Sequence, residues 1–279
     1  MTVLRAERAA VRSLTVTRFE AEEQPAPVED TIAVEEPLEI RLLGETLATT
    51  MRTPGHDPEL VAGWLLSEGI ITRRDDLGEV RHCGRLDDPE YGNVVDVVPA
   101  PGTVIDPALI EGACRSAFTA SACGVCGRRS IDQLLDRATP LDDDTRWPAA
   151  ALAELTSRLR QSQPVFERTG GLHAAAIAWA PDAPLLVRED VGRHNAVDKV
   201  IGRLLLDAAL PMKGAALVVS GRTSFEIVHK AVVARVPIVV AVSAPSSLAV
   251  ETAERAGLTL IGFTRGGSFT AYSGAERVG

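Results

Sequence analysis

The chain contains few aromatic residues and few cysteines. Phe, Trp and Tyr together make up 4% of its 279 residues, so its hydrophobic core has to be built from Ala, Val, Leu and Ile. The four cysteines, Cys83, Cys114, Cys123 and Cys126, are too few for a disulfide framework in a chain of this length. A small secreted domain held together by disulfides is thereby excluded.

Long apolar runs and excess positive charge are also missing. The longest strongly apolar run, 236–242, is far shorter than the roughly 20 residues that cross a membrane. Residues 1–14 carry charges throughout and lack the apolar stretch of a signal peptide. The net charge of -9 argues against nonspecific nucleic-acid binding, which needs a basic surface. We therefore expect a cytoplasmic protein with reduced thiols that binds neither a membrane nor nucleic acid.

The remaining composition is that of an ordinary globular protein, with 46% hydrophobic and 24% charged residues. Residues 1–30 end in an acidic stretch with prolines, which predicts a flexible tail, or an early edge strand, followed by a linker. The rest divides into a β-rich subdomain over 31–106, a cysteine loop and linker over 107–148, and an α/β domain over 149–279. A short helix is expected over 130–138, within the linker region.

The α/β prediction depends on the alternation of strands and helices from about residue 170 onward. The runs 215–219 and 237–242 are rich in Ala, Val and Ile, which is typical of strands buried on both faces. Helical segments are expected over 190–210, 224–234 and 246–256. This order predicts a largely parallel sheet covered by helices.

Cys123 and Cys126 form a Cys-x-x-Cys pair in which each cysteine precedes a glycine. Such a pair lowers the pKa of one thiol, and the glycines allow the loop to bend. A nucleophilic cysteine on such a loop suits a group that takes sulfur from a donor to an acceptor. Half of a zinc site and a dithiol redox couple remain as alternatives, although the cysteines do not repeat a zinc-knuckle spacing.

Polar and glycine-rich segments flank the predicted strands. In open α/β sheets, ligands bind at the carboxyl ends of strands, near helix N-termini. The candidate binding residues are His173; Arg188, Arg193, His194, Asn195 and Lys199; Ser220, Gly221 and Arg222; and Phe263, Thr264, Arg265, Gly266, Gly267 and Ser268. Their cations suit phosphates, and the Phe263 ring suits stacking on a flat base. Each segment alone is compatible with a plain turn or a capped helix start, but together they predict an elongated pocket for an anionic ligand that contains a nucleotide.

Five of these segments occur together in one known family. They are Ser-Ala-Cys-Gly-Val-Cys-Gly, Thr-Gly-Gly-Leu-His-Ala-Ala, Arg-Glu-Asp-Val-Gly-Arg-His-Asn-Ala-Val-Asp-Lys, Ser-Gly-Arg-Thr-Ser-Phe-Glu and Gly-Phe-Thr-Arg-Gly-Gly-Ser-Phe-Thr-Ala-Tyr. With them, the sequence from about Leu38 to Tyr272 resembles the formate dehydrogenase accessory sulfurtransferase family (FdhD). The long Arg-Glu-Asp motif is highly specific, whereas the cysteine loop alone would not be.

The resemblance implies a sulfurtransferase that accepts persulfide sulfur from a cysteine desulfurase. The sulfur then passes to the molybdenum or tungsten bis-molybdopterin guanine dinucleotide cofactor, bound as a substrate, before that cofactor enters formate dehydrogenase. By the same resemblance, Cys123 carries the persulfide, Cys126 has a supporting role, and 263–268 bind the cofactor. No intrinsic metal is expected.

The resemblance also implies a homodimer and a fold similar to that of cytidine deaminases. We therefore expect a three-layer α/β/α domain with a mixed, mostly parallel sheet, beside a smaller N-terminal β-rich α+β subdomain. Deamination itself is not expected, because His173 is followed by two alanines instead of His-x-Glu and the cysteine pair precedes it. A zinc-binding module and a cofactor-binding chaperone, both with purely structural cysteines, remain as alternatives.

Overall fold

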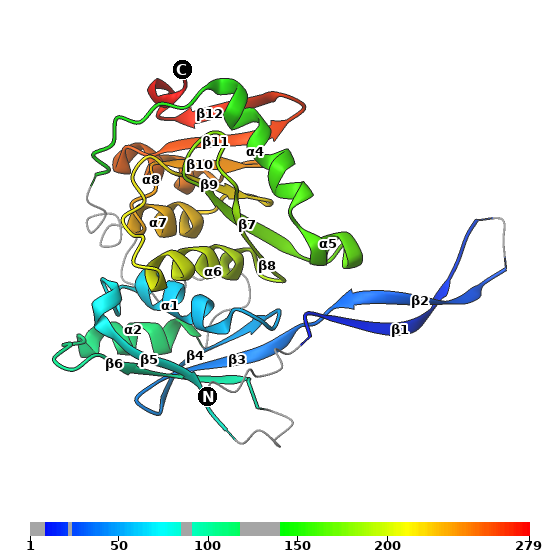
Figure 1. Ribbon diagram of the computed structural model, residues 1–279, viewed down its shortest axis with the longest axis horizontal. Coiled ribbons are helices and arrows are strands. Elements are labelled where there is room, and N and C mark those ends of the chain that lie inside the picture. Colours follow the sequence, from blue (N-terminus) through cyan, green and yellow to red (C-terminus); the bar gives the residue numbers. More distant parts are fainter. Residues whose placement is uncertain (1–8, 22–23, 85–90, 118–139) are drawn as a thin grey trace.

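The computed structural model of the chain describes residues 9–21, 24–84, 91–117 and 140–279. The predicted helix over 130–138 lies outside the described residues, as do Cys123 and Cys126. The described residues form three β-sheets with helices between and beside them (Figure 1). No helix in these ranges is both long enough and apolar enough to cross a membrane.

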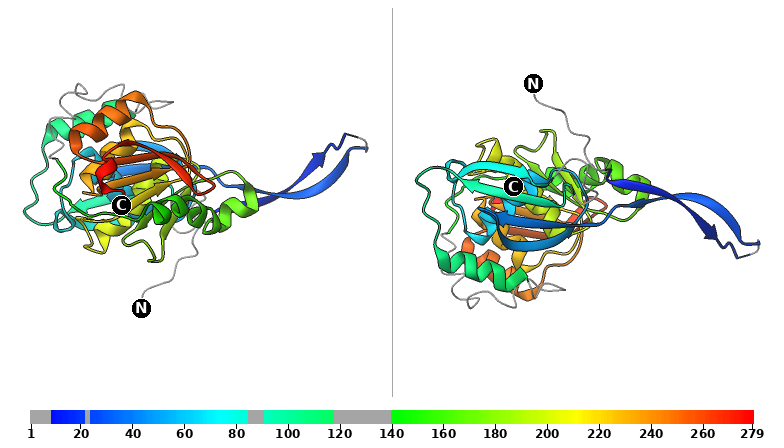
Figure 2. Two further views of the ribbon diagram at one scale, coloured as in Figure 1. Left: turned by 90° about the horizontal axis from the view of Figure 1, so that it is seen from above. Right: turned by 90° about the horizontal axis from the view of Figure 1, so that it is seen from below.

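A two-stranded antiparallel ribbon, β1 (Val11–Arg18) and β2 (Ala26–Ala33), projects from the body of the molecule (Figures 1 and 2). Of the two structures expected within residues 1–30, the paired residues therefore form the early strand and not the flexible tail or linker. Val and Thr are frequent in these strands, and Val16 lies opposite Val28, which favours pairing. The acidic residues and prolines after Arg18 hide this pattern in the sequence.

A four-stranded sheet with the order β4-β3-β6-β5 forms the N-terminal part of the body. Its strands are β3 (Glu36–Leu42), β4 (Glu45–Arg52), β5 (Leu77–His82) and β6 (Val94–Pro99). Helix α1 (Asp57–Glu68) lies between this sheet and the rest of the body, and α2 (Pro107–Ala117) packs against β4 (Figure 1). This arrangement confirms a β-rich α+β unit near the N-terminus.

A six-stranded sheet with the order β12-β11-β10-β9-β7-β8 forms the larger part of the body. Its strands are β7 (His173–Ala178), β8 (Leu186–Asp190), β9 (Ala216–Val219), β10 (Ile238–Ala241), β11 (Thr259–Arg265) and β12 (Ser268–Ser273). Strands β9, β10 and β11 are parallel, β7 is antiparallel to both β8 and β9, and β12 is antiparallel to β11. The expectation of a mixed sheet is therefore confirmed, but only two of its five strand pairings are parallel, so the sheet is not mostly parallel.

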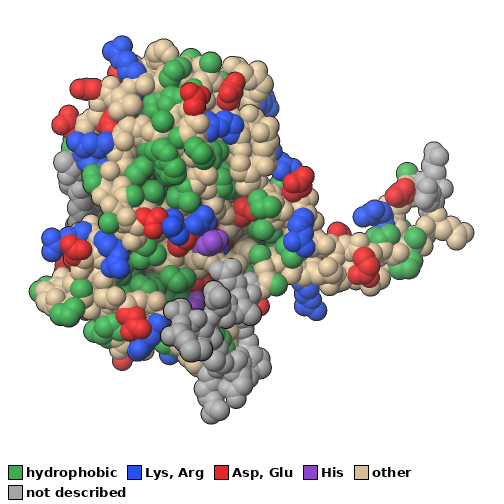
Figure 3. Space-filling model, viewed as in Figure 1, with side chains coloured by type: hydrophobic (Ala, Val, Ile, Leu, Met, Phe, Trp, Pro, Cys, Tyr) green, Lys and Arg blue, Asp and Glu red, His purple; other side chains and the backbone are tan. Residues whose placement is uncertain are grey.

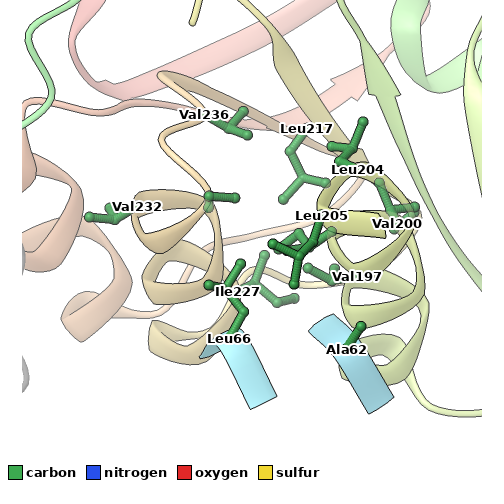
Figure 4. Packing of buried hydrophobic residues seen from close by; sticks show 14 of the residues in the cluster. Ala62, Leu66, Val197, Val200, Leu204, Leu205, Leu217, Ile227, Val232 and Val236 are labelled. Atoms are coloured by element: carbon green, nitrogen blue, oxygen red, sulfur yellow. The ribbon is translucent and has the colours of Figure 1, made fainter. Parts of the chain in front are cut away.

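Helices cover both faces of the six-stranded sheet. They are α4 (Ala149–Gln161), α6 (Arg193–Leu206), α7 (Phe225–Val233) and α8 (Ser247–Ala256), with the short α5 (Pro164–Thr169) near the ribbon. Leu152 and Leu155 of α4 pack on one face against Val218 of β9 and its neighbours. Val200 of α6 and Ile227 of α7 pack on the other, in the cluster shown in Figure 4. The described residues therefore form three layers, α/β/α.

The larger hydrophobic cluster continues from the six-stranded sheet into the N-terminal unit. It joins Leu217 of β9 and Val200 of α6 to Leu60 of α1 and to Leu38 and Ile40 of β3. All five side chains are essentially buried. The two parts of the body on either side of residue 148 therefore share one core.

Candidate functional site

Four separate chain segments meet at one edge of the six-stranded sheet. Strands β8 to β11 run in one direction, so their carboxyl ends lie at this edge, while β7 and β12 run the opposite way and begin there. His173 at the start of β7 accordingly pairs with Asp190 at the end of β8. We call this side, which carries all the predicted binding segments, the strand-end edge.

Gly221, His173 and Arg193 are close neighbours at the strand-end edge. A Cβ atom on Gly221 would lie 3.4 Å from His173 Nδ1 and 3.9 Å from Arg193 Cδ, so glycine lets the loop after β9 pass close to both side chains. Burial lowers the pKa of His173, and the nearby Arg193 and His194 lower it further. His173 is therefore neutral at pH 7, with one ring nitrogen that donates and one that accepts a hydrogen bond.

His194 lies in the first turn of α6, beside the start of α7. Its Nε2 atom is 2.8 Å from Glu226 Oε2 and 3.1 Å from Ser224 Oγ. The side chain of Glu226 is 9% exposed, while that of His194 is 29% exposed. Glu226 therefore orients a histidine that remains accessible from solvent. The sequence analysis missed Glu226, although its place just inside a helix that follows a strand-end loop was a usable signal.

Asp190, at the end of β8, holds the start of α6 in place. Its buried carboxylate accepts hydrogen bonds from the Gly192 amide at 2.8 Å and from Asn195 Nδ2 at 3.0 Å, and it lies 2.7 Å from Lys199 Nζ. Asn195 is 9% exposed and Lys199 1% exposed. Contact between Lys199 and a ligand phosphate would require this ion pair to open, so its observed contacts are those of a positioning residue.

Thr53, just after β4, ties the N-terminal unit to the same buried group. Its amide donates to Asp190 Oδ2 at 3.2 Å, its hydroxyl accepts from the Val191 amide at 3.2 Å, and its carbonyl accepts from Lys199 Nζ at 2.9 Å. Asn195 adds a hydrogen bond to the Met51 carbonyl at 2.8 Å. The end of β4 is therefore part of the support of the strand-end edge, which sequence reasoning did not foresee.

Arg188 of β8 is committed to Glu59 of α1. Its guanidinium donates to both carboxylate oxygens, at 2.5 and 2.9 Å. Burial alone would raise the pKa of Glu59, but the hydrogen bonds from Arg188 and His56 outweigh it and lower the pKa to about 2. The carboxylate is thus ionised at pH 7. Arg188, which was predicted to bind phosphate, is therefore already engaged in a bidentate ion pair with Glu59. Acidic, basic and histidine side chains also gather across the middle of one face of the molecule (Figure 3).

Other candidate residues remain open to solvent. Arg222 and Arg265 are exposed, and Ser220 Oγ accepts a hydrogen bond from the Ala174 amide at 2.9 Å. Within the described ranges, the buried atoms Arg193 Nε and Thr223 Oγ1 have no hydrogen-bond partner. The strand-end edge therefore offers exposed cations together with polar atoms that an anionic ligand could satisfy.

The turn from β11 to β12 completes this edge. Phe263 is 44% exposed and has a φ of 52°, an uncommon left-handed conformation for a bulky residue. Gly266 and Gly267, with φ of 59° and 79°, form the turn, and Ser268 Oγ donates to the Arg265 carbonyl at 3.0 Å. Thr264, in contrast, is 1% exposed, and its side chain is directed into the protein.

The cysteine pair itself lies between two described elements. The chain leaves α2 at Ala117 and is described again from Pro140. Of the cysteines, Cys83 is a free thiol that is partly exposed. No group of three or more His, Cys, Asp or Glu side chains suited to a metal ion occurs in the described part of the chain.

These features define a three-layer α/β/α protein with an anion-suited polar edge and a separate cysteine-bearing segment. A family model, FdhD/NarQ, matches residues 33–279. The chain therefore belongs to the FdhD/NarQ family, as its motifs led us to expect.

Relatives and one solved structure extend the comparison. The chain is 53% identical over 258 residues to the sulfur carrier protein FdhD of Anaeromyxobacter dehalogenans strain 2CP-C, covering 90% of each chain. It is 51% identical over 262 residues to the protein of the same name from Streptomyces coelicolor, covering 89% of each. A crystal structure from Desulfotalea psychrophila, provisionally described as a formate dehydrogenase accessory protein, matches with a TM-score of 0.74 and 23% identity over 97% of this chain and 100% of that one. That likeness shows the fold.

Proposed function

We propose that the protein is a cytoplasmic sulfur carrier and sulfurtransferase in which Cys123 holds a persulfide. Its sulfur donor is a cysteine desulfurase. Its acceptor is the molybdenum or tungsten bis-molybdopterin guanine dinucleotide cofactor, a substrate destined for formate dehydrogenase, and the working unit is a homodimer. The observation that carries the proposal is the identity of about half of all aligned residues to relatives named sulfur carrier proteins. The polar strand-end edge supports it, because a guanine dinucleotide is a large anion.

Loading of Cys123 requires no net oxidation. The Cys123 thiolate attacks the outer sulfur of a donor persulfide, R–S–SH. A new S–S bond forms at Cys123 while the S–S bond of the donor breaks, and the donor leaves as the thiolate R–S⁻. A Cys-x-x-Cys setting favours this step because it increases the thiolate fraction of one cysteine.

Delivery of the sulfur requires two electrons. The outer sulfur of the Cys123 persulfide binds the metal of the substrate, the S–S bond breaks, and Cys123 leaves as a thiolate. The sulfur ends as sulfide, so the reduced metal of the substrate supplies both electrons and is itself oxidised. Cys126 has a supporting role in this step, close to the persulfide in sequence.

The chain's own residues bind and orient the substrate at the strand-end edge. Arg193, Arg222 and Arg265 provide charge-assisted hydrogen bonds to phosphates. His173 and the backbone around Gly221 approach the same region, and the exposed ring of Phe263 provides a surface for a flat base. Asp190, Lys199 and Thr53 hold the start of α6 in place. Arg193 and His194 lie in the first turn of this helix.

Mass spectrometry of the intact protein tests the proposal. After incubation with a cysteine desulfurase and cysteine, we expect a mass increase of one sulfur atom that maps to Cys123. Cys123→Ala should abolish this increase, and the matched control Cys83→Ala should retain it. Sulfur loading that survives Cys123→Ala would overturn the assignment.

Activation of formate dehydrogenase separates the remaining alternatives. A sulfurtransferase with Cys123→Ala should leave formate dehydrogenase inactive, whereas a cofactor-binding chaperone with structural cysteines would retain full activity. A zinc-binding module would contain about one zinc ion per chain, and that zinc would be lost on substitution of Cys123 and Cys126. Guanine-nucleotide binding does not distinguish a chaperone from a sulfurtransferase, because both use the same edge.

A further inference from the structure

A groove lies at the end of α6 that is remote from the strand-end edge. Helix α6 is 14 residues long, which places its two ends about 20 Å apart. The groove has two lobes with volumes of about 470 and 640 Å³, which share Thr72, Arg73 and Asp75. Helices α1, α6 and α7 all end beside the first lobe. We therefore call the two lobes together the helix-end groove.

The first lobe of the helix-end groove is mainly apolar, whereas the second is mainly polar. Leu66, Leu205 and Leu210 contribute to the first lobe, and they belong to, or pack against, the main hydrophobic cluster. Val104 lines the second lobe and is 93% exposed, the largest exposed fraction of any large hydrophobic side chain in the described ranges. The apolar part of the first lobe and the exposed Val104 side chain beside the second therefore offer contacts to an aliphatic side chain of a partner.

The charged side chains around the helix-end groove differ in sign between its two lobes. Arg73, Arg74 and Arg235 surround the first lobe, against the single carboxylate of Asp75. Asp75, Asp76 and Asp106 surround the second, against Arg73 alone. The Arg73 side chain is 74% exposed and lies 3.3 Å from Asp76, and such a surface pair costs little to rearrange. The first lobe therefore suits carboxylates, and the second suits cations.

The start of α2 and the first described residue after the cysteine segment both lie beside the helix-end groove. Asp106 and Leu109, at the start of α2, line the second lobe, and α2 leads directly into residue 118. On the other side, Arg235 Nη2 donates to the Pro140 carbonyl at 3.1 Å. A protein bound in the groove would therefore lie beside the point where the chain leaves the segment that carries Cys123, and about 15 Å, the length of α2, from the point where the chain enters it.

We propose that the helix-end groove docks the sulfur-donating protein during loading of Cys123, an inference that rests on the proposed function. The matching segment of the donor has an aliphatic side chain for the lobes, carboxylates at the first lobe and cations at the second. Because the two lobes carry opposite charge, they fix the direction in which this segment binds. The donor then occupies one end of the molecule while the strand-end edge remains free for the acceptor of the sulfur.

Rates of sulfur loading with two donors test the docking proposal. The groove variant Arg73→Glu with Arg235→Glu reverses two charges of the first lobe. Arg12→Glu with Arg18→Glu makes the same charge change at exposed positions in β1 of the projecting ribbon and serves as the control. Each full-length protein is loaded by a cysteine desulfurase with cysteine and, separately, by glutathione persulfide, which needs no docking. A third variant, Val104→Lys, changes only an exposed side chain of the second lobe, so it should not destabilise the folded protein.

We expect the groove variant and Val104→Lys to load from the desulfurase at least about tenfold more slowly than the wild type, a change of about 1.4 kcal/mol. Both should load from glutathione persulfide at the wild-type rate, and the control should be normal with both donors. Unchanged desulfurase loading in both groove variants would overturn the docking site and leave the sulfur carrier intact, and so would equal slowing with both donors. Failure of wild-type Cys123 to accept sulfur from either donor would instead overturn the proposed function.

Discussion

Gly63 of α1 and Gly202 of α6 meet backbone to backbone. A Cβ atom added to Gly202 would lie 2.6 Å from Gly63 N and 1.8 Å from the Glu59 carbonyl oxygen, and one added to Gly63 would lie 1.9 Å from the Asp198 carbonyl oxygen. Glycine costs about 1 kcal/mol relative to alanine inside a helix. At these two positions glycine is nevertheless required, because any side chain would push the two helices apart.

Gly202→Ala should therefore destabilise the protein by at least about 2–3 kcal/mol, since the added methyl group overlaps backbone atoms that cannot move aside. Urea unfolding followed by circular dichroism measures the loss. Gly112→Ala in α2 is the matched control, because nothing lies within 4 Å of a Cβ at that position. The control should be neutral or slightly stabilising, and equal effects of the two substitutions would contradict the close helix contact.

Lys199→Met should destabilise the protein by about 3–5 kcal/mol, because it leaves the buried Asp190 carboxylate without its cation. The double variant Asp190→Asn with Lys199→Met removes both charges and should recover part of that loss. Thermal unfolding of both variants and of the wild type provides the comparison. A double variant no more stable than Lys199→Met would show that the ion pair is not the source of the effect.

Glu59→Gln should lower the free energy of unfolding at pH 7 by about 1.5–3 kcal/mol through the loss of charge-assisted hydrogen bonds to Arg188. Because the pKa of Glu59 is lowered from 4.5 to about 2, its contribution is complete above pH 4.5 and is lost as the pH falls towards 2. The difference between wild type and variant should shrink over that range. Denaturant unfolding at several pH values measures it, with the exposed Glu79→Gln as control, and a difference that does not change with pH would exclude this linkage.

Arg193→Gln should weaken the binding of guanosine diphosphate by about 10-fold or more, because Arg193 Nε is a buried donor that a phosphate oxygen can satisfy. Isothermal titration calorimetry measures the affinity. Arg146→Gln, an exposed arginine outside the edge, is the control and should bind normally. Equal affinity of the two variants would remove Arg193 from the binding residues.

The sequence was sufficient to predict how some of the candidate segments converge. Once alternating strands and helices indicate a parallel arrangement, the carboxyl ends of β9, β10 and β11 must lie together, and the loops that follow them must be neighbours. The predicted segments that follow β9 and β11 therefore lie on the same side, as expected, whereas His173 reaches that side only because β7 runs antiparallel to its neighbours, which the sequence did not predict. Whether they bind the cofactor remains a prediction.

The sequence could not predict the partners of the charged residues. Arg188 and Glu59 are 129 residues apart and Thr53 and Asp190 are 137 residues apart, so only the packing of α1 against α6 brings them together. For this reason Arg188 and Lys199, which looked like ligand-binding cations, have internal carboxylate partners. Strand β12 was missed for a different reason: its Ser and Thr residues resemble a loop, and it is pairing with β11 that makes this segment a strand.

The opposite directions of β7 and β12 have a consequence for ligand-induced stabilisation. Because these two strands begin where their neighbours end, a single molecule bound along that side as proposed would contact stretches of chain as far apart in sequence as His173 and Ser268. An incompletely assembled sheet cannot present them together. Ligand binding should therefore slow amide hydrogen exchange throughout the sheet and not in one loop alone. The melting temperature of the whole molecule should also rise with ligand concentration.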